Sequence, residues 1–379
     1  MTAATETQRM VRDMARNFAR DRLWPKAAEG DRTGAFPAAE VKEMGRLGLM
    51  GMTVAETWGG AGLDYVSYVL ALEEIAAGEG GTATIMSVNN APFASAIERF
   101  GSDAQKERFL RPAAKGEILG AFCLTEPHTG SDASNLRSRA RLVGNKYVLS
   151  GTKQFITSGS TADVALTFAV TDPAAGKRGI SAFLVPTKTK GYVVASVERK
   201  LGQKCSDTCQ IVFENCEVEP DLMLGQPGEG YKIALANLET GRIAIGAQAV
   251  GMARAAFDVA LAYAQERESF GVKIVEHQAV AFRLADMATR IEAGRQLVHH
   301  AARLRDEGQP CLREAAMAKL FCSEMAERVC SDAIQINGGN GYLADFPVER
   351  IYRDVRVCQI YEGTSDIQKI VISRSLRGQ

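Results

Sequence analysis

The chain has 379 residues, and its 45 basic and 45 acidic residues give a formal net charge of zero. This length allows two or three domains with a sizeable core. The balanced charge argues against a nucleic-acid-binding protein, because such a protein carries a basic face or tail.

The sequence also argues against membrane insertion. No apolar run approaches the roughly 18 residues that cross a bilayer. The N-terminal segment MTAATETQRMVRDMARNFARD has no apolar stretch like that of a signal peptide, and its acidic residues are not typical of a transit peptide. We therefore predict a cytoplasmic protein.

The cysteines and histidines do not form a disulfide framework or a metal site. No two of the eight cysteines form a CxxC pair, and most stand in apolar segments, which indicates reduced, buried thiols. His299 and His300 are neighbours on a predicted helix, so they point to different faces and make a poor metal pair. We expect no metal.

The first third of the chain has a helical pattern. Apolar residues recur at helical spacing near the N-terminus and again over residues 68–77 and 104–110, with glycines between these segments. We predict an N-terminal helical domain over residues 1–119.

From about residue 120 the segments become short, β-branched and bounded by glycine or proline. Examples are KYVLSG, DVALTFAV, ISAFLVP, GYVVASV and CQIVFENCEV. Gly144 and Asn145 stand between two such segments and predict a tight hairpin. We predict a β-barrel or sandwich-like domain over residues 120–225.

The helical pattern returns after GQPG (residues 225–228) and continues to the C-terminus. Residues 243–266, 278–306 and 312–336 form long stretches that are apolar on much of their surface. Such helices must be covered by other helices or by another subunit. We predict a C-terminal four-helix bundle over residues 226–379, and so an α+β multidomain fold.

The glycine clusters favour loops. Neither GGAG (residues 59–62) nor GQPGEG (residues 225–230) is a GxGxxG between a strand and a helix, so a Rossmann site is unsupported. NGGNG (residues 337–341) follows a long predicted helix and is typical of helix termination.

The segment IYEGTSDI (residues 360–367) places Glu362 just before a predicted helix. This residue is either an acid favoured by the helix dipole or a catalytic base. Ser365 and Gln368 predict a capping box. Apolar neighbours would raise the pKa of Glu362 and the helix terminus would lower it, so the net direction stays open.

Four motifs together resemble the acyl-CoA dehydrogenase family. AFCLTEPHTGSDAS (residues 121–134) alone is compatible with simple turn chemistry. It is accompanied, in the family's order, by QFITSG (residues 154–159), RESFG (residues 267–271) and nearly all of residues 335–374. The resemblance covers almost the whole chain. It implies an enzyme that binds FAD and desaturates an acyl thioester between its α and β carbons.

The resemblance implies that Glu362 is the catalytic base that removes the α-proton. In other branches of the family the base stands on a different helix, at the position of Gly241, and glycine cannot serve. The backbone N–H of the glutamate, together with a flavin hydroxyl, is expected to hold the thioester carbonyl. Substrate contacts are implied for Ser131, Glu239, Arg242, Tyr361 and Gly363.

The resemblance also implies which residues contact FAD. Residues near the flavin ring in the same subunit are Phe122, Leu124, Thr125, Gly130, Ser131, Phe155 and Thr157, with Thr364 also near the cofactor. Residues that would reach the diphosphate and adenine of a neighbouring subunit's FAD are Arg267, Ser269, Phe270, Gln278, Gln335 and Gly339. Arg267 alone is equally compatible with a cation at a helix C-terminus. The implied assembly is a homotetramer, a dimer of dimers.

The resemblance leaves the substrate and the electron acceptor open. GQKCSDT (residues 202–208) is similar to medium-chain enzymes, whereas LETGRIAIGAQAVG (residues 238–251) is similar to short-chain and branched-chain enzymes. We expect a short- to medium-chain or branched acyl-CoA. The far end of the acyl tunnel is expected to include part of TIMSVNNAPF (residues 84–93), where Asn89 and Asn90 would shorten or polarise the tunnel if they point into it. The expected acceptor is electron-transfer flavoprotein. The alternatives are a flavin oxidase that uses O₂ and a non-catalytic relative of the fold.

Overall fold

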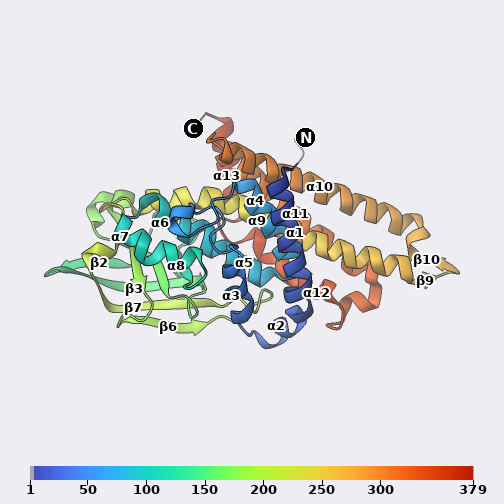
Figure 1. Ribbon diagram of the computed structural model, residues 1–379, viewed down its shortest axis with the longest axis horizontal. Coiled ribbons are helices and arrows are strands. Elements are labelled where there is room, and N and C mark those ends of the chain that lie inside the picture. The colour runs from blue at the N-terminus through green and yellow to red at the C-terminus, as the bar shows by residue number, and fades with distance from the viewer. Residues whose placement is uncertain (1–3, 379) are drawn as a thin grey trace.

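The computed structural model describes residues 4–378, and these form helices, then a sheet, then long helices. The strands of the sheet gather at one end of the molecule, whereas two long helices project from the other end and carry a small β-ribbon at their tip (Figure 1). The predicted order of helical, β and helical regions is confirmed, while the exact domain limits stay a prediction.

The N-terminal region is built around two nearly fully buried helices. In α4 (Tyr65–Gly78) and α5 (Gly80–Val88) almost every residue is buried, because both pack against other helices on several sides. The other helical elements here are α1 (Glu6–Phe18), η1 (Ala19–Leu23), η2 (Trp24–Lys26), α2 (Ala27–Thr33), α3 (Ala38–Arg46), η3 (Glu56–Trp58), η4 (Asn89–Ala94), α6 (Ser95–Phe100), α7 (Asp103–Gln105), η5 (Lys106–Leu110) and α8 (Arg111–Ala114).

The β region is one eight-stranded sheet with the order β6-β7-β3-β2-β4-β5-β8, and β1 pairs in parallel with β4. The hairpin predicted at Gly144 joins β2 to β3 in antiparallel register, with Val143 opposite Lys146. The strands are β1 (Gly120–Cys123), β2 (Arg139–Val143), β3 (Lys146–Thr157), β4 (Val164–Val170), β5 (Ile180–Pro186), β6 (Tyr192–Val197), β7 (Thr208–Val218) and β8 (Met223–Leu224); short 3₁₀ turns are η6 (Pro173–Gly179) and η7 (Pro220–Leu222).

The C-terminal region is a bundle in which α9, α10, α11 and α13 pack on one another. Helix α9 begins at Gly230, thirteen residues before the predicted start, because its first turns pack against the sheet region. The elements are α9 (Gly230–Glu266), β9 (Glu268–Ser269), β10 (Val272–Lys273), η8 (Ile274–Glu276), α10 (Gln278–Asp306), α11 (Leu312–Asn337), η9 (Gly338–Tyr342), α12 (Pro347–Val355), η10 (Arg356–Gln359) and α13 (Ser365–Leu376).

Helix α9 corrects one expectation, because by length and composition it is apolar enough to cross a membrane. However, 78% of its most apolar window is buried inside the molecule, and the core helix of a soluble protein passes the same test. Its apolar character is therefore explained by packing against α4, α10 and α11.

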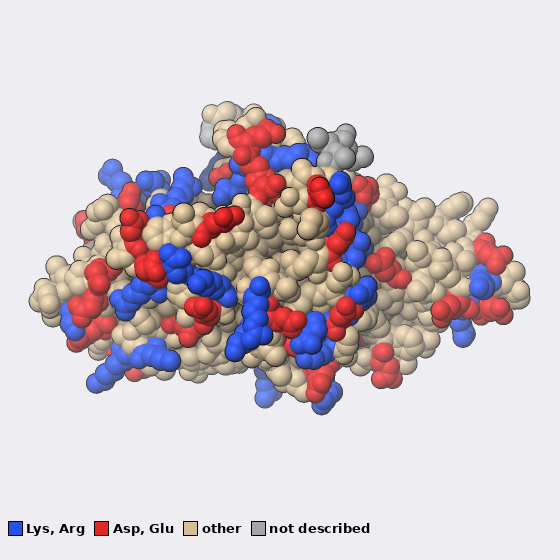
Figure 2. All heavy atoms as spheres, in the orientation of Figure 1, with Lys and Arg blue, Asp and Glu red and all other residues tan. Residues whose placement is uncertain are grey.

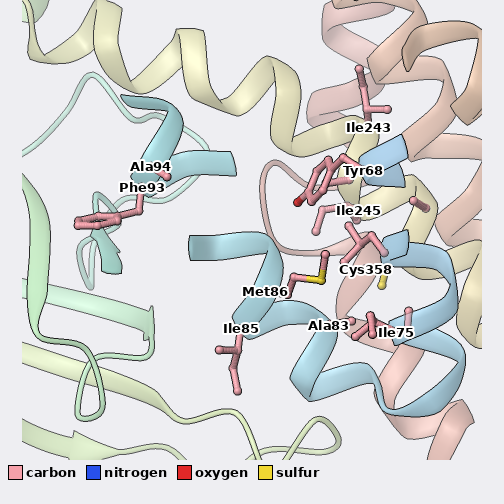
Figure 3. Packing of buried hydrophobic residues seen from close by; sticks show 14 of the residues in the cluster. Tyr68, Ile75, Ala83, Ile85, Met86, Phe93, Ala94, Ile243, Ile245 and Cys358 are labelled. Atoms are coloured by element: carbon pink, nitrogen blue, oxygen red, sulfur yellow. The ribbon is translucent and has the colours of Figure 1, made fainter. Parts of the chain in front are cut away.

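The core joins the two helical regions. Tyr68 and Ile75 of α4 and Met86 of α5 lie in one buried cluster with Ile245 of α9 and with Cys358 (Figure 3). All eight cysteines are free and buried, which confirms the expectation of reduced core thiols.

Candidate active site

Glu362 stands in a tight turn between η10 and α13. Its φ is 52° and that of Gly363 is 92°, so two successive residues have left-handed backbone conformations. For a residue other than glycine this conformation costs roughly 1–2 kcal/mol. The predicted capping box is wrong: Thr364, not Ser365, is the N-cap of α13, and its side chain accepts a hydrogen bond from the Ile367 N–H.

The turn brings the Glu362 carboxylate against the backbone of α9 at Gly241. A Cβ atom added at Gly241 would lie 1.8 Å from Glu362 Oε2. A side chain at position 241 and the Glu362 carboxylate therefore compete for one space. This competition gives a physical reason why Gly241 has no side chain in a chain that places an acid at residue 362.

Burial raises the pKa of Glu362 to about 7, and the nearby charges of Lys319 and Arg242 only partly oppose this rise. The structure therefore answers the question that the sequence left open. Glu362 Oε2 is buried and has no hydrogen-bond partner among the described residues. The carboxyl is thus free to exchange a proton with a bound molecule near neutral pH.

Lys319 of α11 is a site residue that the sequence did not reveal. Its side chain has no exposed surface, and Nζ donates to the carbonyl oxygen of Gly363 at 2.5 Å. Gln368 Nε2 donates to the same oxygen at 2.8 Å, instead of completing a capping box. The one available signal was a lysine inside an otherwise apolar stretch, AAMAKLFC (residues 315–322).

Arg242 and Glu239 lie on α9 beside the glutamate turn. Arg242 is buried, its Nε has no partner among the described residues, and its pKa is lowered by burial against the opposing charges of Glu362 and Glu239. Glu239 accepts a hydrogen bond from Cys311 Sγ at 3.3 Å. The structure thus brings the α9 residues expected at the substrate close to Glu362.

A buried polar cluster lies further along α9. Gln248 Oε1 accepts from the hydroxyl of Tyr361 and from Thr84 Oγ1, both at 3.1 Å, and Thr84 also contacts Gln203 at 2.7 Å. Gln248 follows Gly241 by two helical turns, which is roughly 10 Å along the axis. A hydrogen-bonded polar cluster therefore lies roughly two turns along α9 from the position of the carboxylate.

Asn89 and Asn90 do not take the role expected of them. Asn89 Nδ2 donates to the carbonyls of Met50 and Ala113, and Asn90 Nδ2 donates to those of Leu49 and Met86. Their Oδ1 atoms accept from the backbone of Gly120 and Met52. The donors and acceptors of both side-chain amides are hydrogen-bonded to backbone groups around η4, so they do not polarise an acyl tunnel.

The TEP motif and strand β3 meet at the edge of the sheet. The Gln154 N–H donates to the Thr125 carbonyl at 2.9 Å, which places Thr125 next to Phe155. Phe155 has a φ of 59° and is 65% exposed. An exposed aromatic ring held in a strained conformation, with a threonine hydroxyl nearby, fits the face and edge of a flavin ring.

The other residues predicted beside the ring lie around this edge. Phe122 packs against Phe168 with ring centroids 5.0 Å apart, and Leu124 is buried. Gly130 lies beside Thr125, since a Cβ there would be 3.6 Å from its methyl group. Ser131 is exposed in the same loop, and Thr157 ends β3.

The residues predicted for the far end of FAD lie elsewhere. Arg267 ends α9, and Phe270, at the tip of the β9–β10 ribbon, is 96% exposed. Within one chain this ribbon lies at the opposite end from the sheet (Figure 1). Gln278, Gln335 and Gly339 are exposed near the same region, and Ser269 lies on β9. A single chain therefore does not bring the two predicted halves of the cofactor site together.

Charged side chains are distributed differently over the body of the molecule and over the projecting arm. Lys and Arg are interspersed with Asp and Glu over most of the face in view, whereas the stretch of the projecting arm before its tip is mostly uncharged (Figure 2). Phe282, on α10 of this arm, is 68% exposed. Exposed aromatic rings therefore stand on the arm at Phe270 and Phe282.

Sequence comparison assigns the chain to a family. Residues 5–117, 121–216 and 228–377 match the N-terminal, middle and C-terminal domains of acyl-CoA dehydrogenase. The chain belongs to the acyl-CoA dehydrogenase family. It is an oxidoreductase that dehydrogenates the CH–CH group of acyl-CoA, and like other members of this family it depends on FAD.

The chain is also similar to individual members of the family over nearly its whole length. The chain is 47% identical to the human mitochondrial short-chain specific acyl-CoA dehydrogenase, over 98% of this chain and 90% of the relative. It is 40% identical to butyryl-CoA dehydrogenase from Megasphaera elsdenii, with a TM-score of 0.97 and full coverage of both chains. A chain from a study of the electron transferring flavoprotein of Acidaminococcus fermentans is 45% identical, with a TM-score of 0.98 and 99% of each chain covered.

Proposed function

We propose that this enzyme converts a short-chain or small branched acyl-CoA, extending at most to medium length, into the trans-2-enoyl-CoA, with Glu362 as the base that removes the α-proton. One observation carries the proposal: the Glu362 carboxyl lies against Gly241 with a pKa of about 7, and its Oε2 has no partner in the described part of the chain. A base whose pKa is near the working pH combines a sufficient ionised fraction with enough basicity to take the proton.

The backbone around Glu362 supports a second role. The Glu362 N–H has no hydrogen-bond partner among the described residues, so it is available to a thioester carbonyl. A donor held in a rigid, left-handed turn stabilises negative charge that develops on that oxygen as the proton leaves. When bound, FAD would supply the hydride acceptor for the β-hydrogen, and the protein's own task is to hold the thioester with its α-carbon toward Glu362.

We assign the substrate's polar portion to Arg242, Glu239 and Ser131. Arg242 is a buried cation whose Nε has no partner within residues 4–378, and Glu239 lies one turn before it on α9. Tyr361 and Gly363 flank the base, and Ser131 lies in the exposed loop after the TEP motif. Buried donors of this kind bind phosphate and amide oxygens of a thioester carrier.

The polar cluster on α9 supports a short acyl chain. An acyl chain that runs from Glu362 along α9 meets Gln248, Tyr361 and Thr84 after roughly 10 Å. Placing further methylenes among these groups would break buried hydrogen bonds. The names of the relatives, short-chain specific and butyryl-CoA dehydrogenase, agree with this limit.

The cofactor site supports an assembly of several copies. We propose that FAD lies between Phe122, Leu124, Thr125, Gly130, Phe155, Thr157 and Thr364 of one chain and the arm residues Arg267, Ser269, Phe270, Gln278, Gln335 and Gly339 of another. A homotetramer arranged as a dimer of dimers satisfies this requirement. Electron-transfer flavoprotein is the proposed acceptor, in line with the related chain from the flavoprotein study, and the cytoplasm is the proposed location.

The test is the visible spectrum of the purified protein during anaerobic titration with straight-chain and branched acyl-CoAs. Bleaching of the flavin by C4 to C6 or small branched thioesters, and not after Glu362→Gln, is expected. Turnover of long-chain thioesters alone would contradict the substrate class. Reoxidation by electron-transfer flavoprotein, without peroxide formation in air, separates a dehydrogenase from the alternative flavin oxidase.

A further inference from the structure

Lys319 is a buried cation without a directly paired anion. Its Nζ contacts the Gly363 carbonyl, and no carboxylate lies within 4 Å of it among the described residues. A buried ammonium without a paired charge is costly, and an apolar side chain of similar length would pack at lower cost. Packing alone therefore does not explain the lysine.

Lys319 donates its hydrogen bond to the turn that orients the Glu362 carboxylate. The Gly363 oxygen accepts from both Lys319 Nζ and Gln368 Nε2, directly after the two left-handed residues. Two donors on one carbonyl fix the peptide plane between Gly363 and Thr364, which directly follows the two left-handed residues. Loss of this hold would let the strained turn relax, because the conformation is unfavourable for a glutamate.

We propose that Lys319 is a positioning residue for the reaction: it holds the Glu362–Gly363 turn through the Gly363 carbonyl, and its charge favours the carboxylate form of Glu362. This inference rests on the proposed role of Glu362 as the base. It makes Lys319 part of the catalytic apparatus although it touches neither substrate nor cofactor.

The other titratable groups around Glu362 are uncharged near neutral pH, so Lys319 and Arg242 are the charges that act on its carboxylate. Tyr65 and Tyr68 of α4 face the carboxylate, and burial raises the pKa of both phenols well above the neutral range. Burial also raises the pKa of Cys358, near Lys319, to about 11, so this thiol stays protonated. Burial lowers the pKa of Lys319 to about 8, so Lys319 carries a proton when Glu362 ionises near pH 7.

Three substitutions separate the two parts of this role. Lys319→Met removes both the charge and the donor, Lys319→Gln keeps a donor for the Gly363 carbonyl without the charge, and Lys319→Arg keeps the charge. Lys369→Met is the matched control, because Lys369 is an exposed lysine of α13 that pairs with Glu324.

The main measurement is the pH dependence of kcat/KM for flavin reduction. The acidic limb, near pH 7 in the parent enzyme, should move upward by roughly one pH unit in Lys319→Met and Lys319→Gln, and stay in place in Lys319→Arg and Lys369→Met. On the high-pH plateau, kcat should fall by roughly tenfold in Lys319→Met and by less in Lys319→Gln, which still holds the carbonyl.

A second measurement needs no turnover. The infrared carbonyl band of protonated Glu362 can be assigned by its loss in Glu362→Gln and titrated in each Lys319 variant. A midpoint that rises in Lys319→Gln supports the charge effect independently of catalysis. Identical midpoints and identical acidic limbs in the parent enzyme, Lys319→Met and Lys319→Gln would overturn the inference.

The controls distinguish failure of this inference from failure of the proposed function. Full activity in Glu362→Gln would show that Glu362 is not the base. An inactive Glu362→Gln, together with Lys319 variants whose acidic limbs do not shift, would contradict only the role of Lys319. If Lys319→Met does not fold, the other two variants still decide. Failure of all three to fold would identify a purely structural lysine and count against the proposal.

Discussion

Lys153 in the sheet region and Lys319 in the helical bundle are both fully buried, yet their surroundings differ. Lys153 Nζ donates to Glu126 Oε1 at 2.8 Å and to the Leu124 carbonyl at 3.1 Å. Within residues 4–378, the hydrogen-bond partner of Lys319 Nζ is a carbonyl, and the carboxylate it influences, Glu362, lies beyond direct pairing. One lysine closes an ion pair and the other leaves a carboxyl free.

The two carboxyls respond in opposite ways. Burial would raise the pKa of Glu126, but Lys153 and the N–H groups of Arg137 and Ser138 outweigh it and lower the pKa. For Glu362 burial dominates, and its pKa rises to about 7. The number of donors on the carboxylate separates a permanent brace beneath the TEP motif, which we propose faces the flavin, from a group that can take up a proton.

The largest effect is expected from Glu362→Gln. An amide cannot accept the α-proton, so flavin reduction by acyl-CoA should slow by roughly 10³-fold or more. Anaerobic stopped-flow spectroscopy measures this rate. The flavin spectrum of the variant should match that of the parent, because the substitution lies outside the residues assigned to the ring. A rate within tenfold of the parent would place the base elsewhere.

The buried pair of Lys153 and Glu126 should affect the stability of the protein rather than the rate of the reaction. Lys153→Met leaves Glu126 buried without its cation and should lower the free energy of unfolding by roughly 3–5 kcal/mol. FAD should dissociate more readily, because the Leu124 carbonyl also loses its donor. Urea unfolding and ultrafiltration of FAD measure the two effects.

Lys146→Met is the control for that experiment. Lys146 lies on the same strand but forms an exposed pair with Glu219, so its loss should cost less than about 1 kcal/mol. Equal destabilisation by the two substitutions would show that the buried pair has no special role.

Stability should depend on pH through Glu362. Its pKa is about 7 in the folded protein against an ordinary 4.5, so the folded state binds more protons between these values. The free energy of unfolding contributed by this group therefore falls as pH rises through that window. Glu362→Gln should stabilise the protein at pH 8 by roughly 1–3 kcal/mol and by almost nothing near pH 4. A stability gain that does not change with pH would contradict the raised pKa.

The sequence revealed the groups whose chemistry is local, and missed those that act across the fold. Glu362 was proposed as the base from its motif, and the hairpin at Gly144 was predicted from its turn residues and is confirmed. Lys319 stands 43 positions before Glu362, and periodicity gives no reason to join them. Asn89 and Asn90 looked like cavity residues because a sequence does not show which backbone carbonyls a side chain will meet. The capping box failed because Thr364 and Ser365 are equally suitable N-caps, and the tight turn at Gly363 selects the first.

The last prediction concerns the space that Glu362 shares with α9. Gly241→Ala places a Cβ where Glu362 Oε2 now lies, 1.8 Å away, so the carboxylate must turn aside. Displacement of a base by about 1 Å should lower kcat by roughly 10–100-fold. Gly30→Ala, in helix α2, is the matched control, since its Cβ would meet Cys205 at an ordinary 3.5 Å. Because alanine is a better helix former than glycine, neither variant should lose much stability. Loss of kcat in Gly241→Ala alone, with an unchanged free energy of unfolding, would therefore show that the reaction needs the Glu362 carboxylate in the space beside Gly241. Equal activity of the two variants would mean that Glu362 acts from another position.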